Sequence, residues 1–327
     1  MTVSVLRAGF SSTVQDLGRP GFIDQGISVG GALDANALAV ANLLVGNDPG
    51  AAGLEVTNGR VQMCAADDRL ISWCGGAFTA DLAGTRLAAG RAAFWHAGEE
   101  IIFTSQGGPR AWLAISGGID VPLVLGSRST DLRSGFGGWR GRALADGDLL
   151  PLGATSARSE QFAARLRLPC RANCAAPNEW SAPAMIPPVL RVVRGADWAR
   201  FEPSAQAALT STAFEVTPDA DRMGVRLSGP GLGLRETADL ISEAVVPGTL
   251  QVPPNAQPIL LLGDCQTIGG YPKIAHVIKV DLPRGAQLRA GERVRFVAVS
   301  VEEAQRLWRE RQRDLAWFRA GLSLQMT

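Results

Sequence analysis

The sequence predicts a mainly β protein with few helices. Short segments that alternate apolar and polar residues recur about every ten residues, and Gly, Pro, Asn and Asp separate them. The chain contains 38 glycines and 19 prolines, and helical periodicity is clear in only two places. Strands at this spacing are typical of antiparallel barrels or sandwiches, whereas βαβ units would need a helical segment between strands.

Two hairpins are expected in the first half of the chain. Residues 81–87 alternate on either side of Gly84, which suits a tight turn. Residues 100–105 and 110–116 flank the sequence Gly-Gly-Pro at 107–109, so we expect them to pair with each other.

Two helices are expected. Asp34 is a candidate N-cap for an apolar repeat that continues to Gly46. Near the C-terminus, Ser300 and Glu303 have capping-box spacing, and the apolar face that follows predicts a helix that ends at Gly321. We expect this helix to pack on its own barrel; the alternative is that it serves a subunit contact.

Composition indicates two domains. Apolar residues make up 46% and charged residues 19% of 327 residues, enough to bury a full core. The stretch 156–187 is rich in Ala, Ser, Asn and Pro and is predicted to be a linker. We therefore expect an N-terminal β-barrel domain at 1–155, a C-terminal one at 188–300, and a helix and tail at 301–327.

Several protein classes are excluded by charge and pattern. The formal net charge is +1, so neither nucleic acid nor an anionic membrane is an expected partner. No run of about 18 apolar residues and no signal peptide is evident. Five cysteines, an odd number, favour reduced thiols in a cytoplasmic protein. Cys170 and Cys174 are four apart without a nearby histidine, and with two histidines in all no metal site is expected.

The segment 261–273 is the strongest candidate for chemistry. An apolar strand is followed by an acid, two polar side chains, a Gly-Gly turn, a phenol and an ammonium, namely Asp264, Gln266, Thr267, Gly269, Gly270, Tyr271 and Lys273. Only two of the 32 basic residues are lysines, and Tyr271 is the single tyrosine. We expect Asp264 to set the ionisation of a reacting group while Lys273 offsets negative charge. The alternative is a Gly-Gly turn with a surface ion pair.

Three more residues near this segment are candidates. Arg222 precedes a glycine and a strand, and Glu243 precedes a strand that carries Gln251. Glu243 is either a fixed carboxylate or a solvent-facing one. Cys265 has no visible base beside it, so a nucleophilic role is not expected.

A second candidate loop lies at 115–130. It supplies Asp120, Ser127 and Arg128 after a Gly-Gly pair. The loop either recognises a carboxylate or phosphate through the planar Arg128 fork, or is a turn capped by its own Ser and Thr side chains. No Walker A phosphate-binding motif occurs anywhere in the chain.

Taken together, eight ordered motifs resemble the family called allophanate hydrolase subunit 2, 5-oxoprolinase C-type subunit or biotin-dependent carboxyltransferase. The resemblance extends over about residues 3–300, and its motifs lie at 13–21, 31–34, 41–47, 117–130, 221–227, 241–243, 251–255 and 266–273. Each motif alone is modest, but eight in one order are specific.

The resemblance implies two cyclophilin-like β-barrel domains and a heteromeric complex with a homologue of the family's B-type subunit. In the 5-oxoprolinase version, an A-type subunit completes the ATP-dependent opening of the 5-oxoproline lactam to glutamate. In the carboxyltransferase version, homologous domains pass a carboxyl group from carboxybiotin to urea. A third version is a non-enzymatic regulatory partner of a kinase-inhibitor-like B-type subunit.

One stretch favours the 5-oxoprolinase type. Urea-type members have Gly-Pro-Ser-Leu-Gly-Gly-Phe after the Asp, whereas residues 265–273 here read Cys-Gln-Thr-Ile-Gly-Gly-Tyr-Pro-Lys. No biotinyl-lysine motif is present, so biotin would sit on another chain, and ATP is the expected cofactor, bound here or with the partner.

The leading hypothesis assigns roles within this site. We expect Lys273 and Arg222 to bind a substrate carboxylate or phosphate, and Asp264 and Glu243 to orient or polarise the substrate. Gln266 and Tyr271 would hydrogen-bond the lactam edge. Among the departures from the family pattern, Ala256 replaces a Gly expected after Pro-Pro-Asn.

Overall fold

The computed structural model describes residues 1–166, 175–177, 180, 188–236 and 240–324. Contacts divide the chain into two compact units, one of residues 1–19, 30–184 and 314–327 and the other of residues 20–29 and 185–313. The expected linker at 156–187 lies partly outside the described residues. Its described part contains helix α2 (Ala157–Leu166), which belongs to the first unit. The expected boundaries at 155 and 188 stay a prediction.

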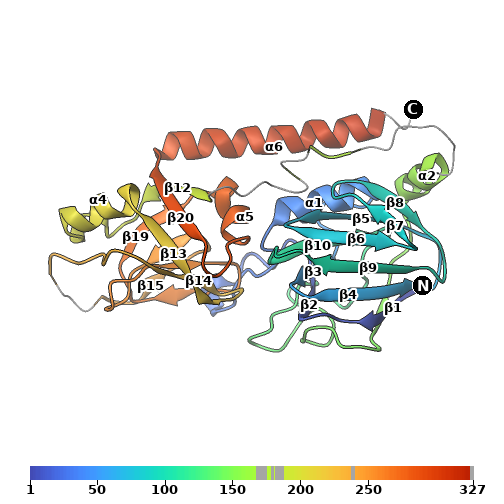
Figure 1. The fold of residues 1–327 in the computed structure, drawn as a ribbon, viewed down its shortest axis with the longest axis horizontal. Coiled ribbons are helices and arrows are strands. Elements are labelled where there is room, and N and C mark those ends of the chain that lie inside the picture. Colours follow the sequence, from blue (N-terminus) through green and yellow to red (C-terminus); the bar gives the residue numbers. More distant parts are fainter. Residues whose placement is uncertain (167–174, 178–179, 181–187, 237–239, 325–327) are drawn as a thin grey trace. The chain divides into compact units, whose positions relative to one another are not determined.

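The first unit is built from two antiparallel sheets (Figure 1). One has six strands in the order β11 (Leu149–Pro151), β1 (Thr2–Arg7), β4 (Arg60–Ala65), β9 (Glu100–Ser105), β6 (Phe78–Leu82) and β7 (Thr85–Leu87). The other has five in the order β2 (Ser11–Gln15), β3 (Gly53–Thr57), β10 (Arg110–Ile115), β5 (Arg69–Gly75) and β8 (Ala92–Trp95). Both sheets contribute buried residues to one core, among them Val5, Phe103, Ile71 and Trp73.

One expected hairpin forms and the other does not. Strands β6 and β7 pair through the turn at Gly84, with Leu82 opposite Thr85, which confirms the first. The second was wrong, because β9 pairs with β4 and β6 in one sheet while β10 pairs with β3 and β5 in the other. Every residue of β10 is buried, as a central strand requires, so the chain crosses between the sheets at 106–109.

Helix α1 (Ala35–Leu44) confirms the first helix prediction. Asp34 Oδ1 accepts a hydrogen bond from the Ala37 backbone N–H at 2.8 Å, and the chain leaves the helix at Gly46 with φ of 78°. The helix covers β5 and β10, and its residues 37–44 are all buried. In this way it closes the outer face of the five-stranded sheet (Figure 1).

The second unit contains a closed barrel of seven strands. In barrel order they are β12 (Val189–Arg194), β19 (Lys273–Val277), β16 (Thr249–Gln251), β17 (Ile259–Leu261), β14 (Gly224–Ser228), β13 (Ala213–Ala220) and β20 (Arg293–Ala298). The pairing of β12 with β20 is parallel, and the other pairs are antiparallel. A separate two-stranded sheet joins β15 (Glu243–Ala244) to β18 (Ile268–Gly269). The mainly β fold is thus confirmed, with a closed barrel and few helices.

Short helices complete the second unit. They are η1 (Ile23–Gln25), η2 (Trp198–Arg200), α4 (Pro203–Ser211), η3 (Lys279–Asp281) and α5 (Leu282–Gly285). Alternate residues of the strands fill the barrel, and the rings of Phe214 and Phe296 lie 5.9 Å apart inside it.

Helix α6 (Val301–Leu324) confirms the C-terminal helix and its cap. The Glu303 backbone N–H donates to Ser300 Oγ at 3.2 Å. The expected end at Gly321 was wrong: the helix continues through it, because Leu322 is buried in the apolar cluster around α1. Residues 301–313 belong to the second unit and the rest to the first, so the helix is not confined to its own barrel as expected.

Candidate functional site

Neighbouring strands of the barrel bring together most of the residues singled out in the second half of the sequence. Strands β14, β17, β16 and β19 are consecutive in the barrel. Gln251 on β16 lies opposite Lys273 on β19, and Glu243 on β15 lies opposite Gly269 on β18. The barrel therefore makes one cluster from segments that lie far apart in the sequence.

Asp264 is paired with Arg222 rather than with Lys273. Arg222 Nε lies 2.7 Å from Asp264 Oδ2 and Nη2 lies 3.0 Å from Oδ1. Both residues are less than one-tenth exposed. The expectation that Arg222 binds a substrate anion meets a physical obstacle, because its guanidinium fork already holds a buried carboxylate in two-point contact.

The neighbouring thiol is inert. Burial, with a smaller contribution from the Asp264 carboxylate, raises the pKa of the Cys265 thiol to about 12. A thiol in that state supplies no thiolate near neutral pH.

Lys273 forms the second ion pair of the cluster. Its Nζ lies 2.9 Å from Glu243 Oε2 and 3.5 Å from Asp197 Oδ2. The Lys273 side chain is 7% exposed, whereas that of Glu243 is 64% exposed. The ammonium therefore sits inside the barrel wall while its partner carboxylate reaches solvent. Asp197 had no place in the sequence prediction, and only the fold brings it beside Lys273.

Two glutamines form a hydrogen-bonded chain between these pairs. Gln266 Nε2 donates to Gln251 Oε1 at 3.1 Å, and Gln251 Nε2 donates to the Tyr271 carbonyl at 3.3 Å. Gln251 is 1% exposed, so these bonds fix the orientation of a buried amide. Gly269 leaves room for it, because a Cβ there would lie 2.6 Å from Gln251 Nε2.

The glutamines and Tyr271 line a hollow of about 450 Å³. Its wall also includes Asp219, Asp221 and Arg226, and its apolar lining includes Ile259 and Leu261. Lys273, Asp264 and Glu243 do not line it. Of the predicted residues, the structure thus places Gln251, Gln266 and Tyr271 at a cavity, whereas Arg222, Asp264, Glu243 and Lys273 form ion pairs and do not line it. Thr267 is buried and Gly270 half-buried beside them.

Arg226 is a second residue that sequence reasoning missed, after Asp197. It belongs to the 221–227 motif, but its residue type alone does not separate it from the 29 other arginines. The alternation of β14 was the available signal: Val225 and Leu227 are buried, and Arg226 between them faces outward.

The predicted loop residues of the first unit are bonded to carboxylates of that unit. Ser127 Oγ donates to Asp16 Oδ1 at 2.6 Å, and the Arg128 backbone N–H donates to Asp16 Oδ2 at 2.6 Å. Arg128 Nη2 donates to Asp120 Oδ1 at 2.8 Å, and its Nε donates to the Val121 carbonyl. The carboxylates that the loop binds are thus Asp120 of the loop itself and Asp16 of the 13–21 motif, both within this chain.

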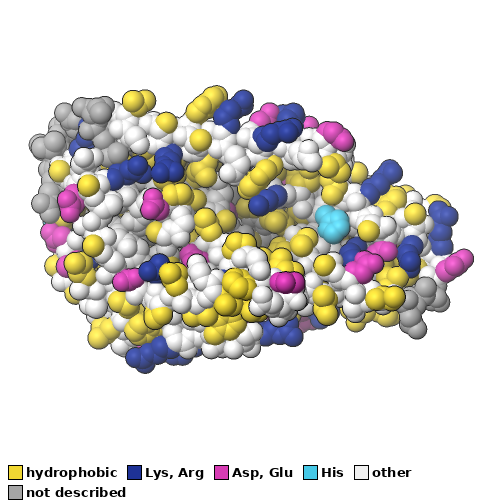
Figure 2. Space-filling model, turned by 180° about the vertical axis from the view of Figure 1, so that it is seen from behind, with side chains coloured by type: hydrophobic (Ala, Val, Ile, Leu, Met, Phe, Trp, Pro, Cys, Tyr) yellow, Lys and Arg dark blue, Asp and Glu magenta, His cyan; other side chains and the backbone are white. Residues whose placement is uncertain are grey.

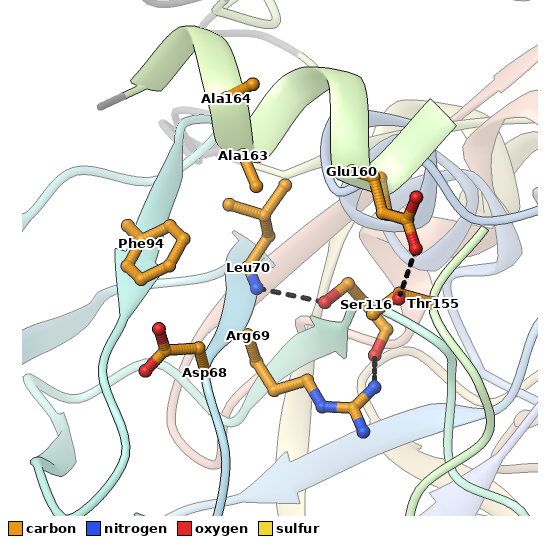
Figure 3. Close-up of a pocket in the computed structure, with 10 residues that line it drawn as sticks. Asp68, Arg69, Leu70, Phe94, Ser116, Thr155, Glu160, Ala163 and Ala164 are labelled. Carbon is orange, nitrogen blue, oxygen red and sulfur yellow. Dashed lines mark hydrogen bonds between the residues drawn. The ribbon is translucent and has the colours of Figure 1, made fainter. Parts of the chain in front are cut away.

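The first unit contains a hollow of about 260 Å³ beneath α2 (Figure 3). Several of its polar groups are bonded to one another, and Asp68 and Ser159 are bonded to residues outside the lining. The Leu70 backbone N–H donates to Ser116 Oγ at 2.9 Å, Arg69 Nη1 donates to the Ser116 carbonyl at 2.9 Å, and Thr155 Oγ1 donates to Glu160 Oε1. With its donors and acceptors occupied, this hollow is a weaker candidate than the one on the barrel.

Three further features concern metal binding, membrane insertion and surface charge. No cluster of three or more His, Cys, Asp and Glu side chains suited to a metal ion occurs among the described residues, which exclude Cys170 and Cys174. None of the described helices is both long and apolar enough to cross a bilayer. Acidic and basic side chains are interspersed on the face drawn in Figure 2.

Comparison with known proteins places these features in a family. Residues 25–298 match the family model described as carboxyltransferase domain, subdomain A and B. The chain belongs to this carboxyltransferase domain family. The match includes the whole barrel and all of the cluster described above.

Two relatives match nearly end to end. The chain is 38% identical over 319 residues to the 5-oxoprolinase C subunit of Escherichia coli (strain K12), covering 96% of this chain and 98% of the relative. It is 33% identical over 314 residues to the 5-oxoprolinase C subunit of Haemophilus influenzae, covering 94% of each. These names imply a hydrolase component and a multi-subunit enzyme for this family branch.

Solved structures show the same fold within longer chains. The Kluyveromyces lactis urea amidolyase matches with a TM-score of 0.87 and 26% identity, over 97% of this chain and 20% of the longer one. The protein TTHA0988 matches with a TM-score of 0.76 and 34% identity, over 90% of this chain and 55% of the other.

Proposed function

We propose that this protein is the C-type subunit of a heteromeric, ATP-dependent 5-oxoprolinase that opens the lactam of 5-oxoproline to glutamate. The observation that carries the proposal is the 38% identity to the Escherichia coli 5-oxoprolinase C subunit across 98% of that protein. The residues of the barrel hollow support it chemically.

The hollow suits a small lactam. Its volume of about 450 Å³ lies in the range of small-molecule sites. A lactam presents one N–H donor and one C=O acceptor side by side. Gln266 contributes an amide whose orientation is held by Gln251, and Tyr271 contributes a hydroxyl, so complementary groups face the cavity.

The ion pairs behind the hollow hold these groups in place. The Lys273–Glu243 pair ties β19 to β15, while the Arg222–Asp264 pair ties the start of β14 to the strand end before Gln266. In this proposal Lys273, Glu243 and Asp264 act on the reaction by fixing the hollow and its electrostatic field.

ATP fits the partner proteins better than this hollow. A triphosphate carries at least three negative charges and is normally held by several cations and backbone N–H groups. Within the described residues, Arg226 is the one cation lining the hollow, and two carboxylates line it as well. We therefore propose that a homologue of the B-type subunit, together with an A-type subunit, supplies the nucleotide site in the cytoplasm. Phosphoryl activation of the stable amide would precede attack by water.

The fold also favours a second candidate function. Similarity to the urea amidolyase at a TM-score of 0.87 supports a carboxyltransferase component that acts on urea or a related amide. The same two glutamines would then face the ureido ring of a biotin carried on another chain. The 5-oxoprolinase proposal ranks first because the identity is higher and both chains are covered almost completely.

One pair of assays separates these functions. The chain is co-purified with the A-type and B-type subunits, and glutamate release from 5-oxoproline is followed with and without ATP. In parallel, urea-dependent decarboxylation of carboxybiotin is followed without ATP. The proposal expects glutamate release that requires ATP and no carboxybiotin turnover. The reverse pattern would establish the carboxyltransferase, and a stable complex active in neither assay would indicate a regulatory partner.

A further inference from the structure

We propose that Arg226 is the anchor for the carboxylate of the substrate and thereby sets the specificity of the barrel hollow for an anionic lactam. This inference rests on the proposed function and deepens it. It reassigns a role that the sequence pattern gave to Arg222 and Lys273.

The other two cations of the cluster are occupied. Arg222 holds Asp264 at 2.7 and 3.0 Å, and Lys273 holds Glu243 at 2.9 Å. Binding a substrate anion at Arg222 would require breaking a buried pair, which leaves the Asp264 carboxylate uncompensated. At Lys273 the anion would compete with Glu243 and Asp197, which already lie within 2.9 and 3.5 Å of the ammonium. Neither residue lines the hollow.

Arg226 differs from Arg222 and Lys273 both in its position and in its lack of a partner within the part of the chain that the structure describes. It lines the hollow, and among the described residues it has no hydrogen bond or ion pair of its own side chain. Its place on the exposed face of β14 puts it opposite Ile259, which offers an apolar surface for the arginine stem. The planar guanidinium is then available for two-point contact with a carboxylate.

Arg226 also lies where two cavities meet. A second hollow of about 640 Å³ shares Asp219, Arg226 and Ile259 with the first. An anion at Arg226 is therefore reached from solvent through either hollow, while the ring of the ligand extends toward Gln266 and Tyr271 in the first.

Two carboxylates lie near Arg226: Asp221 accepts hydrogen bonds, and Asp219 accepts none from the residues that the structure describes. Asp221 Oδ1 accepts from the backbone N–H groups of Met223 and Gly224 at 2.7 and 3.0 Å, so it holds the turn before β14. Asp219 lines both hollows, is exposed, and has no hydrogen-bond or ion-pair partner among the described residues. Its charge opposes an anionic ligand, so it lowers the affinity that Arg226 provides.

This arrangement predicts opposite effects at two positions. Arg226→Gln weakens binding of 5-oxoproline by about tenfold or more, the loss expected for one charge-assisted hydrogen-bonded pair. Asp219→Asn strengthens it by about two- to threefold at low ionic strength, because a like charge is removed. Arg295→Gln, on the exposed face of β20 away from both hollows, is the matched control and leaves binding unchanged.

The test measures binding to the full chain by NMR titration with two probes, 5-oxoproline and 2-pyrrolidinone, which lacks the carboxylate. The inference expects the wild type to prefer 5-oxoproline and Arg226→Gln to lose that preference while its affinity for 2-pyrrolidinone and its melting temperature stay unchanged. A preference that survives in Arg226→Gln, or a wild type that binds neither probe, overturns the inference. Tighter binding of inorganic phosphate than of 5-oxoproline also overturns it.

The assembled enzyme separates this inference from the proposed function. In the complex with the A-type and B-type subunits, Arg226→Gln should raise KM for 5-oxoproline by about tenfold with a smaller change in kcat. If the wild-type complex releases no glutamate but the preference for 5-oxoproline depends on Arg226, the proposed function is contradicted and the proposed binding site is supported. If the complex is active and KM does not depend on Arg226, the proposed function is supported and the proposed role of Arg226 is contradicted.

Discussion

Ala256 carries backbone strain in the turn between β16 and β17. Its φ is +58°, in the left-handed region, where a side chain costs about 1–2 kcal/mol. Glycine relieves that strain, but its greater conformational entropy stabilises the unfolded chain by about 0.4–1 kcal/mol. We therefore expect Ala256→Gly to stabilise the protein by about 0.5–1 kcal/mol in urea unfolding. A loss of stability would show that the strain is compensated elsewhere. The glycine expected from the family pattern thus has a conformational reason.

Asp264 and Arg222 are expected to act on stability as one unit. Removing one partner leaves the other charged and buried, so Asp264→Ala should lower the free energy of unfolding by about 3 kcal/mol. The double variant Asp264→Leu with Arg222→Met should lose clearly less unfolding free energy than the sum of the losses in Asp264→Leu and Arg222→Met measured singly. Additive losses in denaturant unfolding would mean that the pair contributes no coupling. Activity lost in Asp264→Ala alone is therefore weak evidence for a catalytic role.

At the scale of strands, β18 controls the buried glutamine on β16. A Cβ at Gly269 would lie 2.6 Å from Gln251 Nε2, whereas at Gly270 the nearest contacts are ordinary ones at 3.4 Å. Gln251 is buried and its amide is hydrogen-bonded, so Gly269→Ala should cost about 1–3 kcal/mol in stability and displace the amide chain. We expect it to weaken 5-oxoproline binding several-fold, while Gly270→Ala does not. Equal binding by both variants in the same titration would remove Gln251 from the site.

The pairing of β16 with β19 creates a pH dependence. His276 Nδ1 lies 3.2 Å from Thr249 Oγ1, and burial, with a smaller contribution from Lys273, lowers the pKa of His276. The unfolded state then binds a proton more readily than the folded state, so this residue destabilises the fold as pH falls below about 6.5. In melting curves from pH 7.5 to 5, His276→Gln should lose less stability than the wild type. Parallel curves for the two proteins would exclude this contribution.

Elements were predictable where the signal is local. The caps at Asp34 and Ser300 and the turn at Gly84 each depend on neighbouring residues, and each formed. The hairpin through residues 107–109 failed because a local turn signal does not say whether the next strand stays in the same sheet. The predicted end of α6 at Gly321 was wrong because burial of Leu322 outweighs the low helix propensity of Gly321.

At the scale of the whole molecule, the order of the motifs predicted the family and the mainly β fold, and both are confirmed. The site was predictable only in part. The rarity of Tyr271 and Lys273 drew attention to the right strand end, but partner choice depends on strand register, which one sequence does not contain. Asp197 and Arg226 were missed for that reason, since only the closed barrel brings them beside Lys273 and Gln266.

In the proposed function, this chain completes a lactam-opening enzyme that its partners cannot form alone. The most direct measurement is glutamate formation from 5-oxoproline by the A-type and B-type subunits, with and without this chain, at saturating ATP. We expect glutamate to form only when all three proteins and ATP are present, with ADP released in step. A rate that is the same without this chain would contradict the proposed function.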